Sequence, residues 1–299
     1  MAAGGATAAL RQPARQAGLV TVVGEDWAPT GTDDGGIAMT TEPELKGKVA
    51  VVSGASKGIG LAVVRGLTAG GAHVIAGARE SSAGLDELAK SGQVEVVLVD
   101  LSDAGAPAEL VASAGDRLDI LINNVGGAPA RLDGFLSITD ADWQATLNLD
   151  FMAAVRCVRA ALPVMIATGG GAIVSTCSVN ARLPDPEVMD YSVAKAALAS
   201  FSKALSKEVA KHGIRVNTVS PGPVATDLWL GNDGQAATRG AATGADPKDV
   251  AAEVAKQMLT GRFTRPEEVA DLMLYLAGDR AANITGSDFP IDGGLVTTL

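Results

Sequence analysis

The fold is decided by the stretch Ser53-Gly54-Ala55-Ser56-Lys57-Gly58-Ile59-Gly60, which lies between an apolar run and an amphipathic segment of helical length. The apolar run, Val49–Ser53, has the composition of a buried strand, and the segment Gly60–Ala69 has the pattern of a helix. Glycine has no Cβ, so it permits a tight strand-to-helix turn whose backbone amides can approach a pyrophosphate at the positive end of the helix. This context predicts a dinucleotide-binding turn, with G-x-x-x-G-x-G spacing in place of the commoner G-x-G-x-x-G.

Further apolar runs follow at regular intervals along the chain. They are short, continuous and rich in β-branched residues, as strands buried on both faces are, and they cover His73–Gly77, Val94–Val99, Asp119–Ile122, Ala172–Thr176, Arg215–Val219 and Asp288–Ile291. Helix-length segments lie between most of them, among them Tyr191–His212 and Asp140–Thr168, which starts with a capping-box-like Thr139. The alternation predicts a single-domain, Rossmann-type α/β fold: a doubly wound parallel sheet of about seven strands with helices on both faces.

Two segments depart from this alternation. Residues 1–38 show no sustained period of 2 or 3.6, and their composition predicts a disordered N-terminal extension, with the folded domain over residues 39–299. A second Met at position 39 suggests that a shorter functional product could start there. Residues 227–266 are rich in glycine and contain one expected helix, from Asp246 through Met258. They are either a lid or a mobile surface loop; their place after the sixth strand favours a substrate lid, because ligands bind at the carboxyl edge of such sheets.

The composition excludes several classes of function. A net charge of -10 argues against nonspecific binding to nucleic acid or to acidic membranes, and no apolar run reaches the ~18–20 residues that span a bilayer. The chain has only two cysteines and two histidines, without the spacing of metal ligands and away from any Ser or Cys nucleophile signature. We therefore expect no metal site, no disulfide framework and no His-based triad, and we expect a cytoplasmic protein whose chemistry uses other acids and bases.

Further motifs follow the glycine turn in order along the chain. They are Asn123-Asn124-Val125-Gly126 after the fourth strand, Ser178 thirteen residues before Tyr191-Ser-Val-Ala-Lys195, then Pro221-Gly222, and last Ile284-Thr285-Gly286 with Asp292-Gly293-Gly294. With the turn, they resemble the short-chain dehydrogenase/reductase family of the NADP(H) type, in particular the 3-oxoacyl-[acyl-carrier-protein] reductases and related ketoreductases. Val125 departs from the family, which has Ala there. The resemblance runs from about Lys46 to the C-terminal region and assigns residues 39–299 to the catalytic domain of that family.

The resemblance implies four catalytic residues, which are Asn148, Ser178, Tyr191 and Lys195. Tyr191 and Lys195 are spaced i, i+4, so both project from one face of a helix, and an adjacent ammonium favours the phenolate. By the resemblance, Tyr191 gives or takes the proton, Ser178 hydrogen-bonds the substrate oxygen, and Lys195 also binds the nicotinamide ribose. Asn148, in the helix after Trp143, would order a water that links Lys195 to solvent.

Charge near the end of the second strand predicts NADP(H) as the cofactor. NAD-type sites place a carboxylate there, whereas this chain has Ala78 followed by Arg79, with Lys57 in the glycine turn. Glu80 opposes this reading, but two cations outweigh one acid beyond the strand end. Asn124, Asp292 and Gly293 could equally be structural turn residues and are left out of the site. The residues assigned to the cofactor are Gly54, Ser56, Lys57, Gly58, Ile59, Gly60, Arg79, Asp100, Leu101, Asn123, Gly126, Tyr191, Lys195, Pro221, Gly222 and Thr226.

These features predict an NADPH-dependent oxidoreductase that reduces a ketone or other carbonyl to an alcohol, or runs the reverse reaction, on a small-molecule substrate. A secondary-metabolite (polyketide-type) ketoreductase, a non-catalytic NADP-binding regulator and a scaffolding subunit remain alternatives. The polar segment Val179–Asp190 is expected to shape the substrate mouth, where Arg182 could meet an acidic group or lie on the surface. Small residues on the fourth and fifth helices, with the resemblance, predict a homo-oligomer, either a dimer or a tetramer.

Overall fold

The computed structural model describes Met1 and residues 45–298, so the expectations for residues 1–38 and for a start at Met39 lie outside the described residues. Seven strands form one sheet in the order β3-β2-β1-β4-β5-β6-β7, and every neighbouring pair is parallel. They are β1 (Val49–Ser53), β2 (His73–Ala78), β3 (Val94–Leu98), β4 (Ile120–Asn123), β5 (Gly171–Thr176), β6 (Ile214–Pro221) and β7 (Asp288–Ile291). The predicted doubly wound sheet is therefore confirmed, with each strand end within two residues of its expected position.

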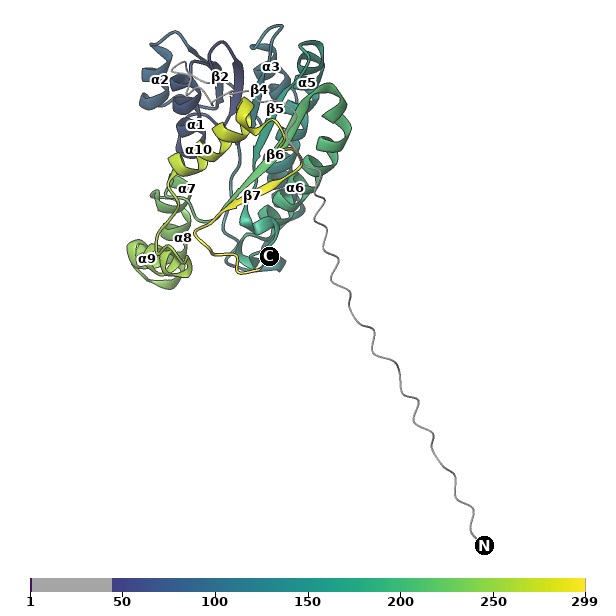
Figure 1. The fold of residues 1–299 in the computed structure, drawn as a ribbon. Coiled ribbons are helices and arrows are strands. Elements are labelled where there is room, and N and C mark those ends of the chain that lie inside the picture. Colours follow the sequence, from purple (N-terminus) through teal and green to yellow (C-terminus); the bar gives the residue numbers. More distant parts are fainter. Residues whose placement is uncertain (2–44, 299) are drawn as a thin grey trace, which may run out of the picture. The chain divides into compact units, whose positions relative to one another are not determined.

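Helices cover both faces of the sheet (Figure 1). On one face, α1 (Gly58–Ala69), α2 (Ala83–Ala89) and α10 (Pro266–Ala277) pack over a cluster that includes Val52 of β1. On the other face, α3 (Ala106–Ala112), α5 (Ala153–Ala167) and α6 (Met189–Val209) pack over a second cluster that includes Val51. Because successive side chains of a strand point to opposite faces, neighbouring apolar residues of one strand supply both cores.

The strand order reverses beside β1. The chain runs from β1 outward to β2 and β3, then returns to place β4 on the other side of β1, with Val51 opposite Leu121. The carboxyl ends of all seven parallel strands meet at one edge, and the crevice between β1 and β4 opens at that edge. In sheets of this kind, ligands bind at this switch point.

The segment Asp140–Thr168 is not the single helix that its pattern predicts. It divides into α4 (Asp140–Leu147), a π-helical turn η2 (Asn148–Met152) and α5. The expected start is confirmed, because Thr139 and Asp142 form a reciprocal capping box. A π-helical turn admits one extra residue into the helix, so the side chains after Leu147 face other directions than a regular helix would give them.

Residues 227–266 are helical over most of their length. The expected helix is present as α9 (Pro247–Gln257), and two short helices that the sequence did not predict, α7 (Asp227–Leu230) and α8 (Gln235–Thr243), precede it. Trp229 of α7 packs edge-on against Phe263, with 5.6 Å between the ring centroids. The segment therefore has its own helices and an aromatic contact, and its role as a substrate lid stays a prediction.

Arg215 joins β6 to the end of α10. Its guanidinium donates to the backbone oxygens of Leu276 (2.6 Å), Ala277 (3.3 Å) and Gly278 (2.9 Å). These carbonyls end a helix, so they have no partner within it. A half-buried side chain of β6 therefore completes the hydrogen bonding of the helix that covers the sheet.

Replacement of Arg215 by Met should lower the free energy of unfolding by about 1–3 kcal/mol, because three carbonyl oxygens lose a charged donor. Urea unfolding followed by circular dichroism measures this change, and Arg159→Met, at an exposed position of α5, is the matched control. Equal stability of the two variants would contradict the bridging role of Arg215.

Candidate active site

The glycine turn lies where β1 passes into α1. Gly54 and Gly58 have φ values of +68° and +55°, which disfavour any residue with a Cβ. A Cβ at Gly60 would lie 2.0 Å from the carbonyl oxygen of Gly54, so the two backbone segments touch. The N-cap residue of α1, Lys57, makes no side-chain capping bond, and the first turn of α1 has no acidic residue. The helix thus presents its amides and its positive end to an anionic group.

Asn124 holds this turn against the end of β4. Its side-chain amide donates to the backbone oxygens of Ser53 (3.3 Å) and Gly54 (3.1 Å), and its Oδ1 accepts from the hydroxyl of Thr176. The choice to treat Asn124 as a structural residue agrees with these contacts. Its neighbour Asn123 lies within the sheet layer, donates to Ser175 Oγ at 3.3 Å, and has no hydrogen-bond partner for Oδ1 among the described residues.

The other residues assigned to the cofactor lie along the carboxyl edge. Asp100 and Leu101 follow β3, Gly126 follows β4, and Pro221 ends β6 with Gly222 after it. Thr226 touches the glycine turn, since its methyl carbon lies 3.1 Å from where a Cβ of Gly58 would be. Within the turn, the backbone oxygen of Ser56 accepts a hydrogen bond from Ser82 Oγ. Ile59, in the first turn of α1, packs against the core cluster under that helix. The structure therefore brings residues from β1, β3, β4 and β6 to one edge.

Some of the charged side chains around this edge have partners, and others are exposed to solvent. Ala78 ends β2 in the core, whereas Arg79 and Glu80 are exposed. Hydrogen bonds from Ser102 and, more weakly, the charge of Arg79 lower the pKa of Asp100. Lys57 pairs with Asp227 of α7 at 3.3 Å. Two cations, Lys57 and Arg79, thus lie by the ends of β1 and β2, and Lys57 contacts α7.

Tyr191 and Lys195 lie together on α6, at the end of β5. Lys195 Nζ is 5.5 Å from the ring centroid of Tyr191 and donates to the backbone oxygen of Thr176 at 3.1 Å. Ser178, two residues past β5, donates to Asn180 Oδ1 at 3.1 Å and also interacts with the Tyr191 hydroxyl. The predicted Ser–Tyr–Lys constellation is thus assembled in space.

Asn148 is not part of this constellation, which corrects the prediction made for it. Its amide nitrogen donates to the backbone oxygen of Ser102, and its oxygen accepts from Arg156 at 2.6 Å. Asp150 lies beside Lys195 instead, with 3.5 Å between Oδ1 and Nζ. A shift of two residues turns a side chain about halfway around a helix, so Asn148 and Asp150 face different sides.

Asp150 and Lys195 are both buried, at 2% and 3% exposure. Burial raises the pKa of Asp150 to about 6, against the opposing attraction of Lys195. Burial lowers the pKa of Lys195, but Tyr191 and Asp150 raise it, and the net direction is upward. Burial also raises the pKa of Tyr191; the charge of Lys195 lowers it and that of Asp150 raises it again. The three groups therefore titrate as one coupled set.

A second buried charge cluster fixes the start of α6. Asp190, directly before Tyr191, is fully buried and accepts from Arg131 at 2.6 Å and from Thr146 at 2.7 Å. Arg131 also pairs with Asp142 at 3.0 Å. Burial raises the pKa of Asp190, but the hydrogen bonds from Arg131 and Thr146 lower it, and the net direction is downward. Arg131 and Asp190 were not among the predicted site residues; the one signal in the sequence was the place of Asp190 next to Tyr191.

Polar contacts join α8 to the body of the domain. Arg239 of α8 donates to Glu187 at 2.7 Å and lies over the ring of Trp229, 5.2 Å from its centroid. Gln235 donates to the backbone oxygen of Ala128. Arg182 instead pairs with Asp288 of β7 at 2.9 Å and is half exposed, which agrees with a surface role.

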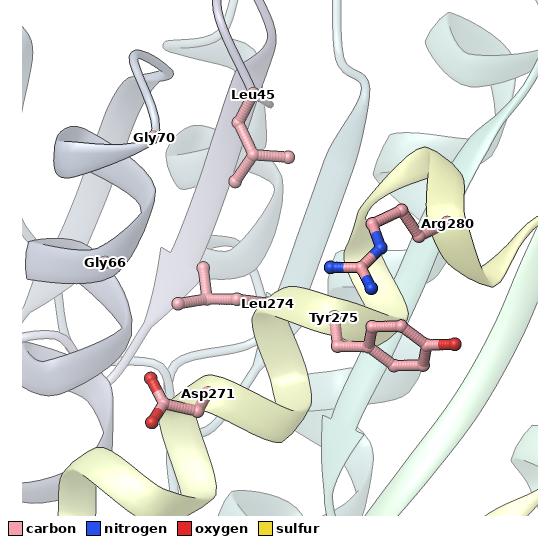
Figure 2. A pocket seen from close by; sticks show the side chains of 7 residues that line it. All are labelled: Leu45, Gly66, Gly70, Asp271, Leu274, Tyr275 and Arg280. Atoms are coloured by element: carbon pink, nitrogen blue, oxygen red, sulfur yellow. The ribbon is translucent and has the colours of Figure 1, made fainter. Parts of the chain in front are cut away.

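A separate pocket lies between α1 and α10 (Figure 2). It has a volume of about 270 Å³ and is lined by Leu45, Gly66, Gly70, Asp271, Leu274, Tyr275 and Arg280. None of the predicted site residues lines it. No helix in the described part of the chain is both long and apolar enough to cross a membrane.

Comparison with known proteins gives relatives that match nearly the whole described domain. A family model described as "Enoyl-(Acyl carrier protein) reductase" matches residues 54–296. A 3-oxoacyl-[acyl-carrier-protein] reductase of Synechocystis is 33% identical over 262 residues, which are 84% of this chain and 98% of the relative. An L-xylulose reductase of Bos taurus is 35% identical over 256 residues, 85% and 98% of the two chains.

A solved structure has the same architecture. It is L-sorbose reductase from Gluconobacter frateurii in complex with NADPH and L-sorbose, which is 37% identical and superposes with a TM-score of 0.78. The match covers 86% of this chain and all of that one. From the family match, these identities and the shared fold, we conclude that the chain belongs to the short-chain dehydrogenase/reductase family.

Proposed function

We propose that this protein is an NADPH-dependent oxidoreductase that reduces a carbonyl group of a small molecule to an alcohol, or catalyses the reverse reaction, with Tyr191 as acid and base. The observation that carries the proposal is the placement of Lys195 Nζ 5.5 Å from the ring of Tyr191, at the sheet edge that also holds the glycine turn. The family membership supports the reaction class, since the relatives named above are reductases.

The carboxyl edge fits a phosphorylated dinucleotide. Gly54, Gly58 and Gly60 allow the tight turn from β1 into α1, which leaves the amides and the positive end of α1 open to a pyrophosphate. Arg79 and Lys57 are the cations in reach of a 2′-phosphate, and Ala78 puts no carboxylate at the strand end. The NADPH complex of the L-sorbose reductase supports the same choice. When bound, the nicotinamide supplies the hydride chemistry.

The side chains of the site divide the remaining work. Tyr191 donates its phenolic proton to the carbonyl oxygen during reduction and takes a proton from the alcohol during oxidation. Ser178 donates a hydrogen bond to the same oxygen and so holds the substrate in line with Tyr191. Lys195 stabilises the phenolate that forms, and its ammonium is placed to hold the ribose hydroxyls of the cofactor.

A non-catalytic regulator is a weaker reading of the same site. Cofactor binding alone needs the glycine turn and the cations, but it does not need Ser178 and Tyr191 placed beside a buried Lys195. The substrate is proposed at the level of class, a small molecule with a carbonyl or hydroxyl group. The named relatives act on an acyl thioester carrier, a pentulose and a hexulose by their names, so 3-oxoacyl, polyketide-type and sugar substrates all belong in the assay panel.

A homo-oligomer and a cytoplasmic location complete the proposal. Of the alanines expected to line a subunit face, Ala153, Ala154, Ala161 and Ala194 are buried within the subunit, whereas Ala197 and Ala199 are partly exposed. These two and the exposed apolar side chain of Val193, all on α6, support an oligomer. Cys157 and Cys177 are both free and buried, which agrees with a reducing compartment.

Replacement of Tyr191 by Phe should lower kcat by at least about a hundredfold, since the phenolic proton is lost. The affinity for NADPH should stay nearly unchanged, because the ring and Lys195 remain. The chain has one other tyrosine, Tyr275 on α10, so Tyr275→Phe is the matched control. NADPH oxidation over the carbonyl panel and NADPH fluorescence titration measure the two quantities; full turnover by the Tyr191 variant would refute its role as acid.

Replacement of Arg79 by Ala should weaken NADPH binding by about tenfold or more and leave NADH binding unchanged, because a charged hydrogen bond to a phosphate is worth about 1.5–3 kcal/mol. Fluorescence titration with each cofactor measures the effect. Arg117→Ala is the control, since this exposed arginine precedes β4 at the opposite edge of the sheet. An equal affinity for NADPH in both variants would show that Arg79 does not select the cofactor.

A further inference from the structure

Asp150 puts an ionisable group where a neutral amide was expected beside Lys195. We propose that its carboxylate is a positioning residue for catalysis: it offsets the charge of Lys195, extends to higher pH the range in which Tyr191 stays a phenol, and so matches the site to proton donation during carbonyl reduction. This inference rests on the proposed role of Tyr191 as acid and base.

Three parts of the chain build the Asp150–Lys195 pair. Asp150 comes from the π-helical turn η2, and Lys195 comes from α6. The loop after β4 supplies the backbone N–H of Gly127, which donates to Asp150 Oδ1 at 3.1 Å. A Cβ at Gly126 would lie 2.5 Å from that oxygen and 3.2 Å from Lys195 Nζ. The pair therefore needs both the π-helical register and the glycine.

The charges around the pair explain its effect on Tyr191. Lys195 faces both Tyr191 and Asp150, and its charge lowers the pKa of each. Asp190 acts on Asp150 from the start of α6, but its own charge is taken up by Arg131. The buried thiol of Cys177, after β5, adds a weak effect on the Tyr191 and Lys195 side of the cluster. With Asp150 charged, the attraction of Lys195 for a phenolate is partly cancelled.

The chemical consequence concerns which form of Tyr191 is present before the reaction. In reduction the O–H bond of Tyr191 breaks, the proton joins the carbonyl oxygen as the new alcohol O–H, and a phenolate remains beside Lys195. A tyrosine that is already ionised has no proton to give. Since the pKa of Asp150 is about 6 and burial raises the pKa of Tyr191, the carboxylate is already charged at the alkaline pH where Tyr191 ionises, and there it delays the loss of the phenol.

Spectrophotometric titration of Tyr191 gives a direct test that needs neither cofactor nor substrate. The chain has two tyrosines, so a Tyr275→Phe background leaves Tyr191 as the single source of tyrosinate absorbance. In this background Asp150→Asn should lower the titration midpoint by about one pH unit or more, the size expected when a near neighbour of one charge is neutralised. Asp140→Asn, at an exposed position of α4, should leave the midpoint unchanged.

Two further variants keep the test decisive if the Asn variant does not fold. Asp150→Ser is also neutral and should lower the titration midpoint of Tyr191. Asp150→Glu keeps the negative charge and should leave the midpoint unchanged. In kinetics, the alkaline limb of kcat/KM for carbonyl reduction should move to lower pH in the neutral variants by the same amount. A midpoint that stays in place or rises in a folded neutral variant overturns the inference. A lowered midpoint without turnover of any carbonyl compound supports the inference and counts against the proposed function.

Discussion

The contact between Gly60 and the carbonyl oxygen of Gly54 is the constraint on which the rest of the structure depends. It lets β1 turn into α1 within a few residues, so the positive end of α1 opens at the carboxyl edge of the sheet. Asn124 then ties this turn to β4, the neighbour of β1 at the switch point. Because all strands are parallel, Ser178 after β5 and Thr226 after β6 arrive at the same edge. The contact between Gly60 and Gly54 thus places the start of α1 at the same edge as the residues that follow the other strands.

Buried charge determines how the side chains proposed for catalysis are held at that edge. An uncompensated charge in the interior is strongly unfavourable, so each buried ionised group needs a partner. Asp190 has Arg131 and Thr146, and Lys195 has Asp150 and the Thr176 carbonyl. The first cluster anchors the beginning of α6 and the second its next turn, with Tyr191 between them. The phenol therefore lies between two ion pairs on one helix, and the charges of the nearer pair act on its pKa together with burial.

The sequence predicted the sheet and the nucleotide turn well because their signals are local. A strand buried on both faces is a short continuous apolar run, and a glycine turn between a strand and a helix is visible in eight residues. The helices α7 and α8 were not predicted because Gly231 and Gly234 allow tight joints between short helices: a Cβ at either would lie less than 3 Å from the backbone oxygen of Asp227. The sequence predicted Asn148 beside Lys195, but the structure has Asp150 there. Both residues lie in a π-helical turn, which no residue pattern marks. The pairing of Arg131 with Asp190 joins residues 59 positions apart, a contact that only the tertiary structure creates.

The strength of each contact also decides what holds residues 227–266 in place. Lys57 and Asp227 link the glycine turn to α7, but their side chains are 72% and 66% exposed, and such pairs contribute at most about 1 kcal/mol. The edge-to-face packing of Trp229 on Phe263 and the less exposed pair of Arg239 with Glu187 are better shielded from water. The helices α7 and α8 are therefore held by contacts within the segment and with the residues before α6. The exposed pair of Lys57 with Asp227 can therefore be lost at little cost to the segment, which leaves Lys57 free for the phosphate contact proposed for it.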